Sequence, residues 1–194
     1  LNKKSEGFKT ASKVQYVATA GNFIDQGFSY DGSMKVMQVI FSYDYLWQNV
    51  RVLGGAYGSM CSFARTGESY FTSYRDPNLM ETYSIYQRAG EYLENFQADE
   101  RDILKYIIGA ISKIDTPMNP SAEGEFSFDA YLLGITTEQL QKERDELLGT
   151  TRDKIRSFAP LVKAITNSNI LCVIGDETKI EGNRDNFQEV LSVF

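Results

Sequence analysis

The stretch 59–74, which reads SMCSFARTGESYFTSY, has the pattern of a β-hairpin. Its two halves, 59–64 and 69–74, are rich in residues typical of strands. The turn RTGE at 65–68 contains Gly67, which can adopt backbone angles that other residues avoid. Because a hairpin joins two antiparallel neighbours, this stretch predicts a sheet with antiparallel pairing.

Two further strands are expected on either side of this hairpin along the chain. The segment Val14–Ala20 is rich in β-forming residues and is followed by Gly21-Asn22, where the strand should end. The segment Ile170–Ile174 is an uninterrupted apolar run, which is typical of a buried strand. The sheet is therefore expected to take most strands from the first half of the chain and one from near its end.

Helical patterns fill the region between these strands. The clearest is an apolar stripe with helical spacing, formed by Ile103, Tyr106, Ile107, Ala110, Ile111 and Ile114. Thr136 and Gln139 have the spacing of a capping box and open a helix that runs through Leu148. Less regular patterns predict further helices from Ser33 to about Trp47, from Asp76-Pro77 to about Phe96, and over 127–133, 152–166 and 178–190, with a loop at 118–125.

This order of elements predicts the fold class. Strands come first, a long helical region follows, and one strand returns, which favours an α+β fold with helices packed on one face of a mainly antiparallel sheet. The length of 194 residues suits one domain, and the hydrophobic share of 42% is enough for a real core.

The composition argues against several classes of function. The net charge is −6 and no basic cluster interrupts it, so no nucleic-acid partner is expected. No stretch approaches the roughly 18 apolar residues of a membrane span, so no membrane partner is expected. The chain has no histidine, which excludes histidine-based triads and histidine-ligated zinc within it. Cys61 and Cys172 lie in apolar runs, and we predict two buried thiols in a reducing compartment.

No local motif forms a complete active site. The cluster Gly54–Gly58 lacks the spacing and the lysine of phosphate-binding loops, so it is interpreted as a tight turn before a strand. The carboxylates within 99–102 and 143–146 are interpreted as solvated helix faces rather than as acid–base pairs. Cys61 has no histidine that would activate it as a nucleophile. By its residues alone, the chain is an α+β domain without an activity of its own.

Several blocks of sequence, in family order across nearly the whole chain, carry a resemblance to a known family. They are YLWQNVRVLGGAYG at 45–58, SYRDPN at 73–78, YIIG at 106–109, DTPM at 115–118, QKERDELL at 141–148 and NILCVIG at 169–175. Together they make the chain resemble the C-terminal part of the pitrilysin/insulinase-type zinc metallopeptidases, and most of all the presequence-protease branch.

The resemblance implies that the chain is part of a larger enzyme. Family members consist of four related domains of a processing-peptidase-like α/β sandwich fold, which close around a chamber for unfolded peptides. Their zinc is bound in the first domain by a His-x-x-Glu-His motif and a distal Glu. Since this chain has no histidine, residues 1–194 are expected to form a single, non-zinc-binding fourth domain. Alone it is expected to cut nothing, because the zinc belongs to the full-length enzyme.

The resemblance also implies roles for individual residues. In the family the fourth domain supplies an Arg and a Tyr that reach the zinc site, and the matching residues here are Arg51 and Tyr57. A Tyr hydroxyl can donate to the oxyanion of the scissile carbonyl, and a guanidinium can hold a substrate carbonyl. Gly54 and Gly55 would let the backbone approach an extended peptide. The alternative interpretation is a surface cation and a strand aromatic.

Two classes of function stay open at this stage. The first is a contributing domain of a zinc-dependent oligopeptidase, with the other domains and peptide substrates as partners. The second is a catalytically inert scaffold or interaction domain of the same fold, and an independent small enzyme is the weakest alternative. The excised domain is expected to self-associate through apolar patches. The cysteines and the lack of a signal peptide in residues 1–7 indicate the cytoplasm, with an organellar matrix as the alternative.

Overall fold

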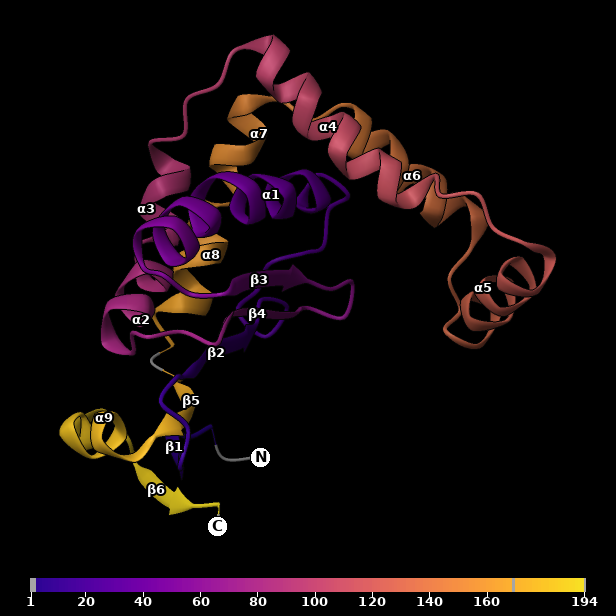
Figure 1. Cartoon of the computed structure of the whole chain (residues 1–194). Coiled ribbons are helices and arrows are strands. Elements are labelled where there is room, and N and C mark those ends of the chain that lie inside the picture. Colours follow the sequence, from indigo (N-terminus) through magenta and orange to yellow (C-terminus); the bar gives the residue numbers. More distant parts are fainter. Residues whose placement is uncertain (1–2, 169, 194) are drawn as a thin grey trace.

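A six-stranded mixed sheet forms the centre of the computed structural model, which describes residues 3–168 and 170–193. The strand order is β3-β4-β2-β5-β1-β6 (Figure 1). The strands are β1 (Glu6–Thr10), β2 (Tyr16–Asn22), β3 (Gly58–Phe63), β4 (Glu68–Tyr74), β5 (Cys172–Asp176) and β6 (Glu189–Ser192). The expected hairpin is confirmed as β3 and β4, and Gly67 in its turn has a φ of 88°.

The sheet combines two kinds of pairing. Strand β2 pairs antiparallel with β4 and β5, and β3 pairs antiparallel with β4, as expected. Strand β1, however, pairs parallel with both β5 and β6. Neither β1 nor β6 was anticipated: β1 lies in a polar stretch, and β6 lies where a helix over 178–190 was expected. Both strands depend on hydrogen-bonding partners far away in the chain, which local sequence patterns do not reveal.

The helices form a layer on one face of the sheet, which confirms the α+β expectation. Helices α1, α2 and α8 contact β3 and β2, and α9 covers the β1 end of the same face, where Ile180 lies against Gly7 (Figure 1). No helix in the described residues is long and apolar enough to cross a membrane. The helices are α1 (Met34–Ile40), η1 (Phe41–Tyr45), η2 (Trp47–Leu53), α2 (Met80–Gln87), α3 (Ala89–Glu94), α4 (Glu100–Ile114), α5 (Pro120–Leu132), α6 (Thr137–Leu148), α7 (Arg152–Ser157), α8 (Ala159–Thr166), α9 (Glu177–Gly182) and η3 (Arg184–Asn186).

The core lies between this helix layer and the sheet. Phe71 of β4 is fully buried, and its ring packs edge-to-face on Phe41 of η1 with centroids 5.3 Å apart. It also stacks on Tyr86 of α2 at 5.7 Å. Burial of such a side chain stabilises the fold by roughly 1.5–3 kcal/mol. These contacts fix the helix that contains η1 and η2 against the sheet.

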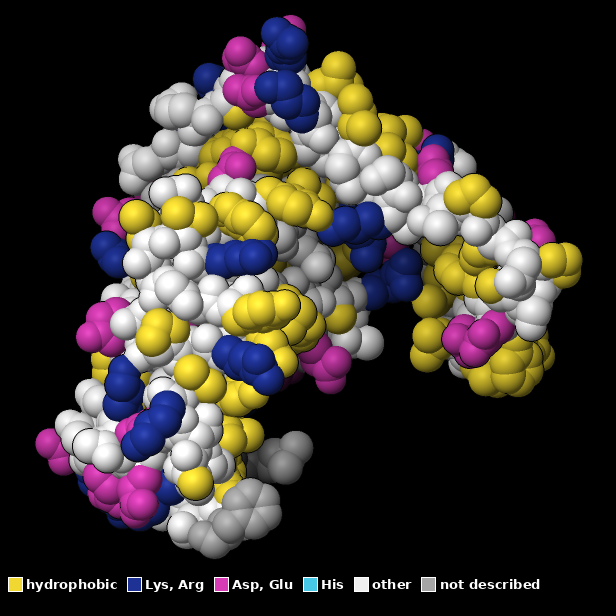
Figure 2. Space-filling model, viewed as in Figure 1, with side chains coloured by type: hydrophobic (Ala, Val, Ile, Leu, Met, Phe, Trp, Pro, Cys, Tyr) yellow, Lys and Arg dark blue, Asp and Glu magenta, His cyan; other side chains and the backbone are white. Residues whose placement is uncertain are grey.

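One part of the chain projects away from this body. Helices α4 and α6 lie side by side and extend outward, and α5 lies at their far end (Figure 1). We call residues 115–136, with α5 at their centre, the arm. Arg144 of α6 forms a bidentate ion pair with Asp115, which ties the start of the arm to α6. No residue of α5 is buried, and Figure 2 shows hydrophobic side chains on its surface.

The most regular helical patterns are confirmed. Helix α4 buries Ile103, Ile107 and Ala110 of the predicted stripe, and α6 begins with the capping box of Thr136 and Gln139. The helix predicted to end near Trp47 in fact continues to Leu53 through turns of π-helix.

Three other helix predictions are wrong in extent because of proline chemistry or local turns. Pro160 lies at the start of α8, where its missing N–H does no harm, so the segment 152–166 is two helices rather than one. Pro120 starts α5 in the same way, so the expected loop at 118–125 is partly helix. Helix α2 begins at Met80, beyond Pro77, and a break before α3 divides the segment that was predicted as one helix to Phe96.

Candidate functional site

A long helix ends at the turn that carries the predicted site residues. Helices α1, η1 and η2 follow one another from Met34 to Leu53. The helix ends because Gly55 has a φ of 80°, which favours glycine, and its N–H donates to the Arg51 carbonyl at 2.9 Å. At Gly54 a Cβ would lie 2.5 Å from the Val50 carbonyl oxygen. The backbone therefore requires glycine at both positions, because Gly54 and Gly55 end the helix and turn the chain into β3.

Arg51 lies in the last turn of this helix and is exposed. Its guanidinium carbon lies 4.1 Å from the ring centroid of Trp47, one helical turn earlier. No ion pair engages Arg51 among the residues that the structure describes. The stacked ring orients a guanidinium whose N–H groups can donate to a ligand.

Tyr57 lies at the other end of the same turn, directly before β3, and its side chain is 66% exposed. Its backbone N–H donates to the carbonyl of Arg75 at 3.3 Å. Its ring packs edge-to-face on Tyr74 with centroids 5.6 Å apart, and Tyr74 packs on Tyr16 at 5.4 Å. Tyr57 is thus the first ring of a row that continues across β4 and β2.

A second turn, directly after β4, supports the glycine turn. Asn78 donates from its side-chain amide to the carbonyl of Gly54 at 2.6 Å, and its backbone N–H donates to Asp76 at 2.8 Å. Asp76 is fully buried and also accepts a hydrogen bond from the Thr82 hydroxyl at 2.7 Å. This chain of hydrogen bonds anchors the turn between Arg51 and Tyr57 to the start of α2.

The row of rings lies on the face of the sheet opposite the helix layer, which we call the open face. The pairing of the strands brings apolar side chains together on the open face. Tyr16 of β2 lies beside Ile174 of β5, for example, and β6 extends the same face beyond β1. Its large apolar side chains are between 37% and 54% exposed, and they belong to Tyr16, Met60, Tyr70, Tyr74, Ile174 and Leu191. The site is therefore a pair of hydrogen-bond donors beside an apolar surface.

The two cysteines lie on opposite faces of the sheet. Cys61 is buried beneath the helices, and this burial raises the pKa of its thiol to about 12. Cys172 faces the open face and is only half-buried, although burial raises its thiol pKa as well. The prediction of buried thiols is confirmed for Cys61 and wrong for Cys172. A thiol that stays protonated is a poor nucleophile, so the geometry gives Cys61 no catalytic role.

The acidic clusters have structural partners. Asp99 caps α4 by accepting from the N–H of Asp102 at 2.8 Å, in line with its interpretation as a helix-end carboxylate. Glu143, by contrast, forms a bidentate ion pair with Arg65 of the hairpin turn at 2.5 and 2.7 Å. Its interpretation as part of a solvated face is wrong, because the packing of α6 on the body brings Arg65 to it.

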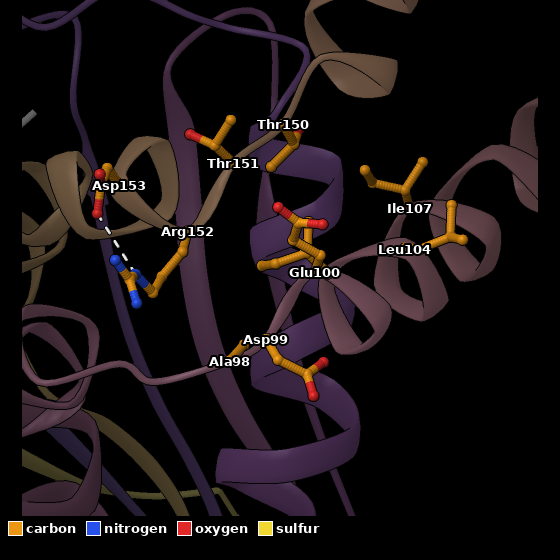
Figure 3. Close-up of a pocket in the computed structure, with 10 residues that line it drawn as sticks. Ala98, Asp99, Glu100, Leu104, Ile107, Thr150, Thr151, Arg152 and Asp153 are labelled. Atoms are coloured by element: carbon orange, nitrogen blue, oxygen red, sulfur yellow. Dashed lines mark hydrogen bonds and ion pairs between the residues drawn. The ribbon is translucent and has the colours of Figure 1, made fainter.

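A hollow of about 730 Å³ lies between the start of α4 and the start of α7 (Figure 3). Several of its polar groups take part in helix capping or local pairing: Thr151 accepts from the N–H of Lys154 at 3.2 Å, and Arg152 pairs with Asp153 at 3.4 Å. None of the predicted site residues lines it. The hollow therefore offers no converging reactive groups.

The side chains that the structure describes do not fit a zinc ion. No group of three or more His, Cys, Asp or Glu side chains comes together within residues 3–168 and 170–193. Structural zinc sites need four such ligands and catalytic sites three.

The fold is similar to that of solved domains of M16-type peptidases. The structure is similar to a conserved protein from Enterococcus faecalis, with a TM-score of 0.64 and 18% identity over 92% of this chain and 43% of that one. It is similar to pitrilysin with a TM-score of 0.59 and 14% identity over 89% of this chain and 19% of that one. A further match is an M16 inactive domain from Pseudomonas fluorescens, with a TM-score of 0.61 and 13% identity over 89% of this chain and 42% of that one.

Sequence comparison then identifies the family. The model described as the PreP C-terminal domain matches residues 5–177, so the chain belongs to this family. The chain is 45% identical over 193 residues to "Protein HypA" of Clostridium perfringens, covering 100% of this chain and 20% of that protein. It is 35% identical over 191 residues to presequence protease 1, chloroplastic/mitochondrial, of Arabidopsis thaliana, covering 96% and 18%. It thus spans about a fifth of these curated relatives, and the predicted resemblance to the presequence-protease branch is confirmed.

The structure brings the four predicted site residues into one turn but does not test their roles. Arg51 and Tyr57 lie on either side of Gly54 and Gly55, as their spacing requires. Sequence reasoning missed Trp47, although its position four residues before Arg51 on a helix is a usable signal. It also missed Asn78, which no local pattern connects to the glycine turn.

Proposed function

We propose that the chain is the C-terminal domain of a larger zinc-dependent peptidase, which hydrolyses unfolded peptides in a closed chamber. The proposal is supported by membership in the PreP C-terminal family and by relatives named as presequence proteases, about five times as long as this chain. In it, residues 1–194 act as a single domain that is inactive alone and works with the other domains of the polypeptide.

One observation carries the assignment of residues. Arg51 and Tyr57 are both exposed on a single glycine-capped turn, at the edge of an apolar sheet face. A solvent-exposed Tyr and Arg without ion-pair partners are free to donate to a ligand. The Gly54–Gly55 backbone between them carries no side chain that would keep an extended peptide at a distance.

The chemistry follows from the donors that this turn presents. During peptide hydrolysis the scissile carbonyl oxygen gains negative charge, and donors fixed in advance lower the barrier because they need no reorganisation. Tyr57 would donate its hydroxyl to this oxygen, and Arg51 would hold a neighbouring carbonyl through its guanidinium. Trp47 beneath Arg51 and the hydrogen bond of Asn78 to Gly54 would keep both donors in position.

The test uses the full-length protein that contains this segment, with a quenched fluorescent peptide as substrate. Tyr57→Phe removes the hydroxyl and keeps the ring, and we expect kcat/KM to fall by roughly 10²–10³. Arg51→Ala should cause a loss of similar size, and Arg51→Lys should restore only part of it, since an ammonium lacks the planar fork. Tyr43→Phe is the matched control, because Tyr43 is 59% exposed on η1, outside the site turn. Unchanged turnover in Tyr57→Phe and Arg51→Ala would refute the assigned roles.

An inert scaffold of the same fold is the second candidate. It is favoured by solved neighbours that are described as inactive peptidase domains. In that case the Arg51 and Tyr57 variants would leave turnover unchanged, while removal of the whole segment would still abolish assembly.

We place either form of the protein in a reducing compartment, the cytoplasm or an organellar matrix, because Cys61 and Cys172 are free thiols.

A further inference from the structure

Helix α5 exposes large apolar side chains that none of the described residues covers. Phe128, Tyr131 and Leu132 are 60%, 81% and 63% exposed. They are spaced i, i+3 and i+4, so they form one patch on the helix surface. We call these three residues the arm patch. Figure 2 shows hydrophobic side chains, with acidic ones beside them, at this end of the molecule.

The opposite side of α5 is also apolar. Phe126 lines hollows together with Leu140 of α6, and it therefore faces the α4–α6 pair. Of the arm patch, Tyr131 also lines one of these hollows, whereas Phe128 and Leu132 line neither. Apolar side chains therefore lie on more than one side of α5, and a single flat surface cannot cover all of them. Hollows lie between α5 and α6 beside Phe126, so Phe128 and Leu132 should have a different surface against them.

The charge around the arm patch indicates the chemistry of that second surface. Between Lys113 and Lys142 the sequence has no Lys or Arg but five carboxylates. Two of them, Glu125 and Asp129, lie one helical turn before Phe128 and Leu132, respectively. A partner surface should therefore be apolar with a basic rim. An anionic bilayer would repel these carboxylates, which argues against a membrane as the occupant.

We propose that the arm patch docks on an apolar, basic-rimmed surface of another domain of the same polypeptide. The inference rests on the proposed function only in assuming that the chain is part of a longer protein. The chain spans about a fifth of its relatives, so four fifths of such a polypeptide is available to cover the arm. The patch lies on α5, away from the turn of Arg51 and Tyr57, so it concerns domain arrangement rather than chemistry.

The first test is hydroxyl-radical footprinting of the full-length protein without substrate. Docking predicts that Phe128, Tyr131 and Leu132 are labelled severalfold more slowly in the native protein than after unfolding in urea. Equal labelling of Tyr131 in both states would overturn the proposal. If the protection of these side chains disappears on dilution, a second copy of the protein covers the arm patch and the proposal is wrong. If protection is seen only with added peptide, the substrate covers the patch and the proposal is also wrong.

The second test identifies the partner by zero-length carbodiimide cross-linking, which joins carboxylates to nearby lysines. We expect Glu125 or Asp129 to be linked to a lysine outside these 194 residues. Mixing unlabelled and ¹⁵N-labelled protein distinguishes links within one polypeptide, which support the proposal, from links between copies, which overturn it. The variant Glu125→Gln/Asp129→Gln should lose the link and label faster at Tyr131.

Glu123→Gln is the matched control for these variants. It removes the same kind of charge from the same helix, but Glu123 lies one turn before Phe126 and Ser127 rather than before the arm patch. It should leave the footprint unchanged. Peptide turnover is measured in parallel: if Tyr57→Phe has no effect but the arm patch is protected, the catalytic proposal fails and the docking proposal stands.

Discussion

Phe71 in the body and Phe128 in the arm are the same residue type, yet Phe71 is fully buried and Phe128 is 60% exposed. Phe71 packs between two other aromatic rings, one from η1 and one from α2. Phe128 belongs to a helix in which no residue is buried. The body is thus held by contacts within this chain, whereas the arm leaves its large apolar side chains exposed.

The largest expected difference between the two regions is in side-chain truncation. Phe71→Ala should lower the free energy of unfolding of the 194-residue chain by about 3–5 kcal/mol, because it leaves a cavity in a packed core. Phe128→Ala should change it by less than about 0.5 kcal/mol, as is usual for exposed positions. Urea unfolding followed by circular dichroism measures both values. A large loss in Phe128→Ala would mean that the arm is packed within this chain after all.

Glycine-to-alanine substitutions distinguish the body from the arm, because they should lower the stability of the body and raise the stability of α5. Gly55→Ala forces alanine to a φ of 80° and should destabilise the body by about 1–2 kcal/mol. Gly124→Ala, in α5, meets no atom within 4 Å and should stabilise that helix by about 0.5–1 kcal/mol. Hydrogen exchange of the amides around each position reports the local change. Slower exchange around Gly55→Ala would contradict the role of this residue in ending the helix.

The smallest expected difference is in acid sensitivity. In the body, burial acts to raise the pKa of Asp31, but the Lys154 ammonium at 2.5 Å and the hydrogen bonds from Ser33 outweigh it, so the pKa is lowered from 3.8. A lowered pKa adds stability that is fully present above 3.8 and is lost as the pH falls through the folded-state value. Asp31→Asn should therefore remove less than about 1 kcal/mol at neutral pH and flatten the acid side of the stability curve.

The arm provides the control for this pH dependence. Arg144 lowers the pKa of Asp115 at the start of the arm, but both side chains are exposed and screened by salt. Asp115→Asn should leave the urea midpoint of the body unchanged across the acid range. An equal response of Asp31→Asn and Asp115→Asn would indicate that the arm and the body unfold as one unit.

Local patterns predicted those elements whose stability is local. The stripe of α4 and the capping box of Thr136 and Gln139 were correct because their signals lie within a few residues of one another. The β3–β4 hairpin was correct for the same reason, since its turn carries Gly67. Helix α5 was predicted only in its second half, as a short helix over 127–133, because Pro120 and Gly124 resembled loop signals although Pro120 in fact starts the helix.

The candidate site also combines residues that are close in sequence with supporting residues that are distant in sequence. The four residues Arg51, Gly54, Gly55 and Tyr57 are close in sequence, and the structure places them in one turn. Their support comes from a distance, through Asn78 after β4 and through the row of Tyr74 and Tyr16. No spacing rule connects residues from two strands, the turn after one of them and a helix end.

The sequence by itself determined the α+β class, the hairpin, the regular helices and, through the absence of histidine, that no histidine-ligated zinc site exists in this chain. It also determined the family, because matching blocks occur along nearly its whole length. Only the tertiary structure decided the parallel pairing of β1 with β5 and β6, the open face, and the exposed arm. The physical reason is that these features depend on backbone hydrogen bonds and apolar contacts between distant segments, which no short window of sequence contains.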